Sequence, residues 1–179
     1  MTAANPATRI LLDWWHAKRG PRAMPARADL DPLELKAILP QLLLIDVAVA
    51  AEPRRFVFTC RLAGTEIDSR FGVNLTGVTL DQAPFGEARA AIRQEYEAAV
   101  NEQLPVLCSH SVVVDGGRSV EYERLVAPLS GKDNAVTALA VAIDFNCVHR
   151  LESGRPSACS NLGPCDRIDL CLMRPAAPG

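Results

Sequence analysis

Three cysteines near the end of the chain have the residue type and the regular spacing that most suggest chemistry. Cys159, Cys165 and Cys171 follow one another at steps of six residues, and Cys147 and His149 lie upstream of them. Five such side chains are enough to hold zinc or an iron–sulfur cluster, but structural zinc sites usually have two to four residues between cysteines. A segment containing Pro, Gly and Ser also fits a thiol cluster that responds to oxidants. We therefore keep three interpretations: a loosely ordered tail with incidental cysteines, a redox-active cluster and a metal site.

His110 is a second candidate, because a neutral imidazole can bind a metal or orient a carbonyl group. We expect it in a strand over 106–114, where it could ligate a haem iron or hold a carbonyl-bearing ligand. Tyr122 and Arg124, in the next expected strand, could offer a hydroxyl and a guanidinium to a ligand carboxylate or phosphate. The alternative is a partly exposed, hydrogen-bonded histidine near a hairpin end, with Tyr122 and Arg124 solvated or in cross-strand pairs.

Alternating apolar residues over 56–62 predict one wall of an apolar pocket. The residues of this half-buried strand that face one way are Phe56, Phe58, Cys60 and Leu62. Placed against helices, they would enclose a hollow together with Phe71, Ile92 and Tyr96. Ligand sites are usually apolar hollows with a few polar groups that orient the ligand. The alternative is a filled core without a ligand.

Two adjacent tryptophans mark a candidate interface. Trp14 and Trp15 lie in a predicted amphipathic helix over 7–19, on a stripe with Ile10 and Leu11. Such large rings need cover, either from the protein's own sheet or from a second chain. Aromatic residues are enriched at interface hot spots, which favours a dimer contact.

The charges of the chain argue against a nucleic-acid partner. The formal net charge is −2, and aromatic residues make up only 5% of the chain. A local basic run is formed by Lys18, Arg19, Arg22 and Arg27. Because acids follow it directly at Asp29, Asp31 and Glu34, we expect salt pairing within this N-terminal arm.

The expected secondary structure describes an α+β domain built on one antiparallel sheet. Helices are expected over 7–19 and from 31 to about 40, with strands over 42–50 and 56–62. A short helical turn, a long helix over 86–103 and three more strands follow, over 106–114, 119–129 and 135–145. Strands at each end with helices between them favour this class. The last strand is apolar at both parities, so it should be covered on both faces and lie centrally in the sheet.

Several motifs in a fixed order resemble a PAS-like family found mainly in alphaproteobacteria. They are Arg19-Gly20, the Pro-x-Arg-Ala-Asp-x-Asp-Pro stretch over 25–32, Arg-Leu-x-Gly-Thr over 61–65 and Gly-x-x-Leu-Thr-Gly over 72–77. The resemblance covers about residues 8–145 and implies the PAS fold. That fold has a five-stranded antiparallel sheet with helices on one face, here with an N-terminal helical extension. We accordingly divide the chain into an N-terminal helix and arm (1–30), a PAS-like domain (31–146) and a cysteine-containing tail (147–179).

The resemblance implies a sensory or regulatory module, which we expect to stand alone. We find no Ser/His/Asp arrangement, phosphate loop or paired carboxylates placed for acid–base work, so we do not expect an enzyme. The flavin-photoreceptor string Asn-Cys-Arg-Phe-Leu-Gln is absent, and no kinase, cyclase or DNA-binding region follows the PAS-like segment. We therefore expect output through a homodimer or an unidentified protein partner, with room for a small ligand whose identity, like that of any cofactor, is unknown. One alternative is a redox- or metal-responsive switch run by the tail cysteines. A second is a small α+β enzyme, for which only the residue types of Asp46 and His110 suggest an acid–base pair.

Nothing in the sequence predicts a membrane segment or a secretory signal. The N-terminal apolar patch is broken by Asp13 and has no small-residue cleavage site. The longest apolar runs fall short of the roughly 18–20 residues that span a bilayer. We expect a cytoplasmic protein whose cysteines are thiols.

Overall fold

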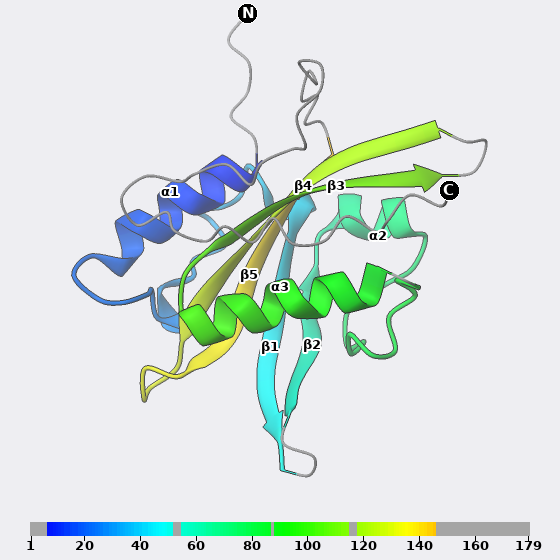
Figure 1. The fold of residues 1–179 in the computed structure, drawn as a ribbon. Helices are drawn as coiled ribbons and strands as arrows, with labels where there is room; N and C mark the ends of the chain where they lie inside the picture. Colours follow the sequence, from blue (N-terminus) through cyan, green and yellow to red (C-terminus); the bar gives the residue numbers. More distant parts are fainter. Residues whose placement is uncertain (1–6, 52–54, 87, 115–117, 146–179) are drawn as a thin grey trace, which may run out of the picture.

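The computed structural model describes residues 7–51, 55–86, 88–114 and 118–145, which form a five-stranded antiparallel sheet with helices packed on it (Figure 1). The strands are β1 (Leu42–Ala50), β2 (Arg55–Ala63), β3 (Val106–Val114), β4 (Arg118–Ser130) and β5 (Val136–Asp144). Their order across the sheet is β2-β1-β5-β4-β3. The predicted α+β class and the five-stranded PAS-like sheet are confirmed.

β5 is the central strand, as its apolar residues at both parities predict. It pairs with β1 on one side and β4 on the other, and every residue from Ala138 to Asp144 is buried. Its large residues face one core and its alanines face a second core on the other side of the sheet. The sheet therefore separates two different apolar layers.

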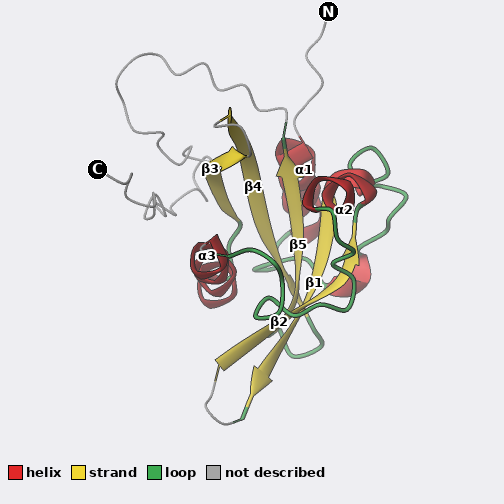
Figure 2. Cartoon of the chain, turned by 90° about the vertical axis from the view of Figure 1, so that its right-hand side faces the viewer, coloured by secondary structure: helices red, strands yellow, loops and turns green. Residues whose placement is uncertain are grey.

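The helix α3 (Ala88–Glu102) lies across one face of the sheet, and the short helix α2 (Thr65–Phe71) adds Ile67 to the core formed there. Figure 2 shows α3 on one side of the sheet and the helix α1 (Ala7–Arg19) on the other. We call the two sides the α3 face and the α1 face. Each face has a helix as cover, so neither side of the central strands is open to water.

Small residues on β5 explain how α1 approaches the sheet. Ala138, Ala140 and Ala142 face α1, and the fully buried Trp15 belongs to the same core. The Trp15 indole Nε1 donates a hydrogen bond of 2.8 Å to the carbonyl oxygen of Pro128 on β4. A large ring on the helix thus packs over a small-residue patch, and its one polar group is satisfied.

The segment after the arm differs from the prediction. The helix expected from Asp31 to about Pro40 is a run of turns that ends in a 3₁₀ helix over Leu39–Gln41. Its hydrogen bonds join residues three apart, as in Ile38 N–H to the Leu35 carbonyl at 2.9 Å. Leu35 and Ile38 are both buried, so contact with the core shapes this segment more than helix propensity does.

A β-bulge on β2 overturns the predicted orientation of Leu62. Leu44 of β1 pairs with Leu62 and Ile45 pairs with Cys60, so Arg61 has no partner on β1. One extra residue reverses the alternation of the strand beyond it. Phe58 and Cys60 therefore face the α3-side core, whereas the Leu62 side chain is 46% exposed.

Within the described residues, no helix is both long enough and apolar enough to cross a membrane.

Candidate functional site

Side chains almost fill the apolar pocket predicted between the sheet and the helices. The cavity on the α3 face has a volume of about 20 Å³ and is lined by Phe58, Cys60 and Tyr96, with Leu75, Leu80 and other apolar residues. That space is enough for about one water molecule. The described side chains therefore form a packed core in this state of the protein.

The other predicted pocket residues are divided between the core and the surface. Ile92 is buried in the core, and Phe56 packs against it in part. Phe71, 36% exposed, packs edge to face on Phe85, with 5.4 Å between ring centroids. Leu62 points away, as described above, so the predicted aromatic wall is only partly assembled.

A buried polar cluster joins α3 to β3 and β4. The Glu95 carboxylate has Oε2 at 2.7 Å from Nη1 of Arg124 and Oε1 at 2.9 Å from Nε2 of His110. Nη2 of Arg124 donates a hydrogen bond of 3.1 Å to the Tyr122 hydroxyl. Glu95 is 7% exposed and Arg124 is 2% exposed, so both charges lie inside the protein.

Strand register brings the sheet residues of the cluster together. His110 pairs directly with Tyr122, and Cys108 pairs with Arg124. Residues two apart on a strand share a face, so all four side chains point toward α3. The His110 and Tyr122 rings stack with centroids 4.9 Å apart. Of these residues, the sequence singled out His110, Tyr122 and Arg124 for a ligand site, and the structure brings them together.

Glu95 is the member that sequence reasoning missed. The buried residues of α3 are Ile92, Glu95, Tyr96 and Ala99. Their spacing is that of one helix face turned to the core, so Glu95 sits inside an otherwise apolar stripe. A carboxylate in such a stripe signals a buried partner, and this signal was present in the sequence.

The charges of the cluster hold one another in the ionised state. Burial by itself raises the pKa of Glu95, but Arg124 and His110 outweigh it and hold this pKa below its ordinary value. Burial lowers the pKa of Arg124, but Glu95, with smaller contributions from Tyr122 and Tyr96, outweighs burial and raises this pKa above its ordinary value. Removing one partner would leave the other charged and buried, which is costly.

One atom of the cluster is poorly satisfied. Nε2 of His110 lies at ion-pair distance from Glu95 Oε1, but it is buried and has no partner with hydrogen-bond geometry among the described residues. Buried polar atoms are nearly always hydrogen-bonded. The contact with Glu95 is therefore close but imperfectly aligned, and this nitrogen has room for a further interaction.

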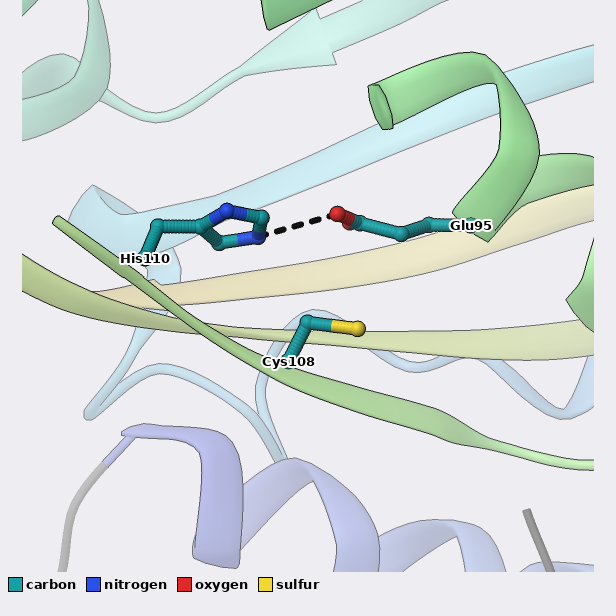
Figure 3. A group of neighbouring side chains, drawn as sticks. All are labelled: Glu95, Cys108 and His110. Carbon is teal, nitrogen blue, oxygen red and sulfur yellow. Dashed lines mark ion pairs between the residues drawn. The ribbon is translucent and has the colours of Figure 1, made fainter. Parts of the chain in front are cut away.

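Cys108 completes the group, as Figure 3 shows with Glu95 and His110. Sγ of Cys108, a carboxylate oxygen of Glu95 and a ring nitrogen of His110 all lie within 4.8 Å of one another. Cys108 is buried and is not in a disulfide. Sulfur, nitrogen and oxygen donors thus converge on one point between α3 and β3.

A second polar group lies on the α1 face, next to the first along β4. Glu123 and Asp144 are both buried and pair across β4 and β5. Asp144 Oδ2 accepts a hydrogen bond of 3.1 Å from the backbone N–H of Ala7, and Glu123 Oε2 accepts one of 3.2 Å from the Thr8 hydroxyl. These carboxylates satisfy the start of α1, where negative charge is favourable.

The predicted tryptophan interface does not fit the structure. Trp14 is 8% exposed, and Trp15 and Leu11 are fully buried against the protein's own sheet, with Ile10 partly buried beside them. Trp14 Nε1 donates a hydrogen bond of 2.9 Å to Glu34 Oε2. The small residues of β5 already provide the cover these rings need, so they are not available for a dimer contact.

The structure does not bring Asp46 and His110 together as an acid–base pair. Asp46 alternates with Ile45 and Val47, which belong to the α3-side core, so it faces the opposite side of the sheet from His110. There Asp46 lies 2.8 Å from the Arg27 guanidinium. Expected salt pairs within the arm are present as Lys18–Glu34 and Arg22–Asp29, each at 2.7 Å.

The tail cysteines Cys159, Cys165 and Cys171, and with them Cys147 and His149, lie outside the described residues. Their three interpretations stay predictions.

The family follows from a comparison with known protein families. A family model described as a PAS domain matches residues 3–142, well over half of the chain. The chain belongs to the PAS domain family. The match includes α1 and the strands β1 to β4, and it ends within β5. PAS domains are in general sensory modules, and the narrower resemblance to alphaproteobacterial members stays a prediction.

Solved PAS structures are similar at low identity. The PAS domain of BvgS from Bordetella pertussis is 16% identical, with a TM-score of 0.46, over 65% of this chain and 87% of that chain. A sensory box sensor histidine kinase from Vibrio cholerae is 14% identical, with a TM-score of 0.40, over 63% of this chain and 87% of that chain. A LOV protein from Rhodobacter sphaeroides is 12% identical, with a TM-score of 0.42, over 67% of this chain and 71% of that chain. No curated protein matches the chain.

Proposed function

We propose that this PAS domain is a regulatory module whose input is received at the Glu95–His110–Arg124 cluster and whose output is a contact with another protein or a second copy of the chain. The observation that carries the proposal is the buried ion pair between Glu95 and Arg124, at 2.7 Å, which ties α3 to the sheet. A change of charge or ligation there alters a buried polar connection between these two elements.

The cluster is a better input site than the apolar cavity. The cavity of about 20 Å³ has room for about one water molecule, so a larger ligand would have to displace packed side chains. The cluster contains a buried nitrogen, Nε2 of His110, that has no well-aligned hydrogen-bond partner in the part of the chain that the structure describes, and the His110 side chain is 18% exposed. A small ligand or ion can therefore reach it from the surface.

Adjacent residues on β4 offer a route from this site to the opposite face. Arg124 binds Glu95 on the α3 face, and the preceding residue, Glu123, accepts the Thr8 hydrogen bond on the α1 face. A shift of the β4 backbone at Arg124 moves Glu123 with it, because the two share a peptide unit. We propose that the start of α1 responds to the state of the cluster.

Amide hydrogen exchange tests this connection. The Glu95→Gln variant of the full chain removes the buried negative charge, and we expect the amides of Leu11 and Leu12 in α1 to exchange several-fold faster. The matched control is Glu97→Gln, two residues along the same helix, where the side chain is partly exposed and lies 3.4 Å from Arg93. We expect α1 to be unchanged in this control.

The pattern of exchange decides the outcome. Faster exchange in α1 with unchanged exchange in β1 and β2 supports a specific connection. An equal increase throughout the sheet reports global destabilisation and contradicts the proposal, as does an unchanged α1. The oligomeric state of the two variants, measured by light scattering, then shows whether the output is a second copy.

A further inference from the structure

We infer that Glu95, Cys108 and His110 form a binding site for a zinc-class transition-metal ion. Each residue supplies one donor atom, and the three donors lie within 4.8 Å of one another. The inference names the ligand of the cluster described above; its regulatory meaning rests on the proposed function, but the binding itself does not.

Binding of an ion requires the sulfur donor to move inward and the oxygen and nitrogen donors to move slightly apart. Around a tetrahedral zinc ion, ligand atoms stand about 3.3–3.6 Å apart, given the usual Zn–S, Zn–N and Zn–O bond lengths. Oε1 of Glu95 and Nε2 of His110 are already closer than this, at 2.9 Å. An ion between them would separate the two atoms slightly and draw Sγ of Cys108 inward. Cys108 and His110 share one face of β3, so rotation of their side chains moves both donors within the same space beside α3.

The donor set selects the class of ion. A thiolate and an imidazole favour zinc and neighbouring transition metals, whereas magnesium and calcium prefer oxygen ligands alone. Three protein donors leave a fourth tetrahedral position for water or an exchangeable ligand. A ligand that exchanges at this open position could change the state of the site.

The contact of His110 with Glu95 is imperfectly aligned, which gives a second observation at the same place. Nε2 of His110 is buried without a hydrogen-bond partner among the described residues, although it faces the carboxylate of Glu95. A metal ion at the centre of the three donors would take the lone pair of this nitrogen. The unsatisfied atom and the cluster therefore point to the same place.

Arg124 supports the site more than it opposes it. Its guanidinium holds Oε2 of Glu95 and the Tyr122 hydroxyl, which leaves Oε1 directed at His110. Outer residues of this kind orient a ligating carboxylate. The Cys108 thiol loses its proton to solvent when the ion binds, so the charge of the cluster rises by one unit rather than two.

Cobalt(II) titration tests the site, because a thiolate–cobalt bond has an intense near-ultraviolet band. The background is the full chain in which Cys147, Cys159, Cys165 and Cys171 are replaced by Ser, so that tail thiols cannot contribute. We expect one equivalent of Co²⁺ to give this band, and Zn²⁺ to displace the cobalt because zinc binds such sites more tightly.

Three further variants in that background separate the site from general effects. We expect Cys108→Ser to abolish the band and His110→Gln to weaken Co²⁺ binding by more than about tenfold, as loss of a ligand or its support does. Cys60→Ser is the matched control, since it removes the other buried thiol of the described residues, and we expect it to leave the band unchanged. Circular dichroism confirms folding, and His110→Gln decides the question if Cys108→Ser does not fold.

The possible failures are distinct. Absence of the band in the background protein, or its persistence in Cys108→Ser, overturns the metal site. Equal weakening by Cys60→Ser overturns it as well. Normal metal binding with no exchange response in α1 leaves the site established and overturns the proposed regulatory connection alone.

Discussion

The two faces of one sheet use buried polar groups in different ways. On the α1 face, buried polar side chains bind backbone groups directly: the Trp15 indole donates to the Pro128 carbonyl, and Asp144 accepts from the first N–H of α1. On the α3 face, Glu95 and Arg124 are shared among several partners, and Nε2 of His110 has no hydrogen bond among the described residues. The first arrangement fixes a helix in place. The second can change state, because its groups have more than one way to be satisfied.

The same difference appears in the apolar packing. β5 presents alanines to α1, and these let a fully buried tryptophan fill the space. Toward α3 it presents Leu139, Val141 and Ile143, and a cavity of about 20 Å³ lies in that core. A cavity gives the side chains around it room to rearrange, whereas close packing resists rearrangement. The α3 face is therefore the side on which we expect motion.

Breaking the ion pair should have the largest effect. Arg124→Met leaves Glu95 charged and buried, and we expect the free energy of unfolding to fall by about 3–5 kcal/mol. Urea denaturation measures this. The double variant Glu95→Leu/Arg124→Met should recover most of the loss, because no charge is then left uncompensated. Additive losses would show that the two residues do not act as one unit.

A single hydrogen bond on the α1 face should matter less. Trp15→Phe keeps an aromatic ring but leaves the buried Pro128 carbonyl without its indole partner. We expect the free energy of unfolding to fall by about 1–3 kcal/mol. Thermal and urea unfolding monitored by circular dichroism provide the measurement. A fall in the free energy of unfolding as large as that of Arg124→Met would show that the polar groups of the two faces contribute equally to stability.

The hydrogen bond that caps the start of α1 should contribute still less to the free energy of unfolding, and its contribution should be independent of Trp15. Asp144→Ala removes the acceptor for the first N–H of α1, and we expect a loss of about 0.5–2 kcal/mol. Combined with Trp15→Phe, the loss should be additive, because Asp144 contacts Ala7 at the start of α1, whereas Trp15 lies about two turns further along the helix. Strong coupling between them would mean that the α1 face also behaves as a connected unit.

Local patterns in the sequence predicted most of the fold. Apolar residues at both parities placed β5 at the centre of the sheet, and the spacing of Trp14, Trp15 and Leu11 gave the helix α1. The pattern could not show which surface covers that helix, because the alanine patch that receives it lies more than a hundred residues away. Such long-range contacts have no local signal.

The candidate site was predicted only in part, for a similar reason. His110, Tyr122 and Arg124 carry recognisable chemistry, but their counter-charge comes from Glu95 on a separate helix. The sequence shows Glu95 inside the apolar stripe of α3, but it does not show that Arg124 is its partner. The predicted orientation of Leu62 was wrong because a bulge at Arg61 reverses the alternation of β2. That bulge appears only in the pairing with β1, which the sequence of β2 does not show.

The smallest expected effect is a pH dependence at the exposed end of α1. Hydrogen bonds from Lys18 and Trp14 hold the pKa of Glu34 below its ordinary value. A carboxyl whose pKa is lowered on folding stabilises the protein above its unfolded pKa, near 4.5, and this contribution is lost as the pH falls through the folded value. Glu34→Gln should therefore be slightly less stable than wild type at pH 7, and the difference should shrink toward pH 3. Glu102→Gln, at the exposed end of α3, is the control for removing a surface charge. A difference that grows in acid would mean that Glu34 stabilises α1 through its neutral form, and the α1 face would then carry a proton-dependent contact of its own.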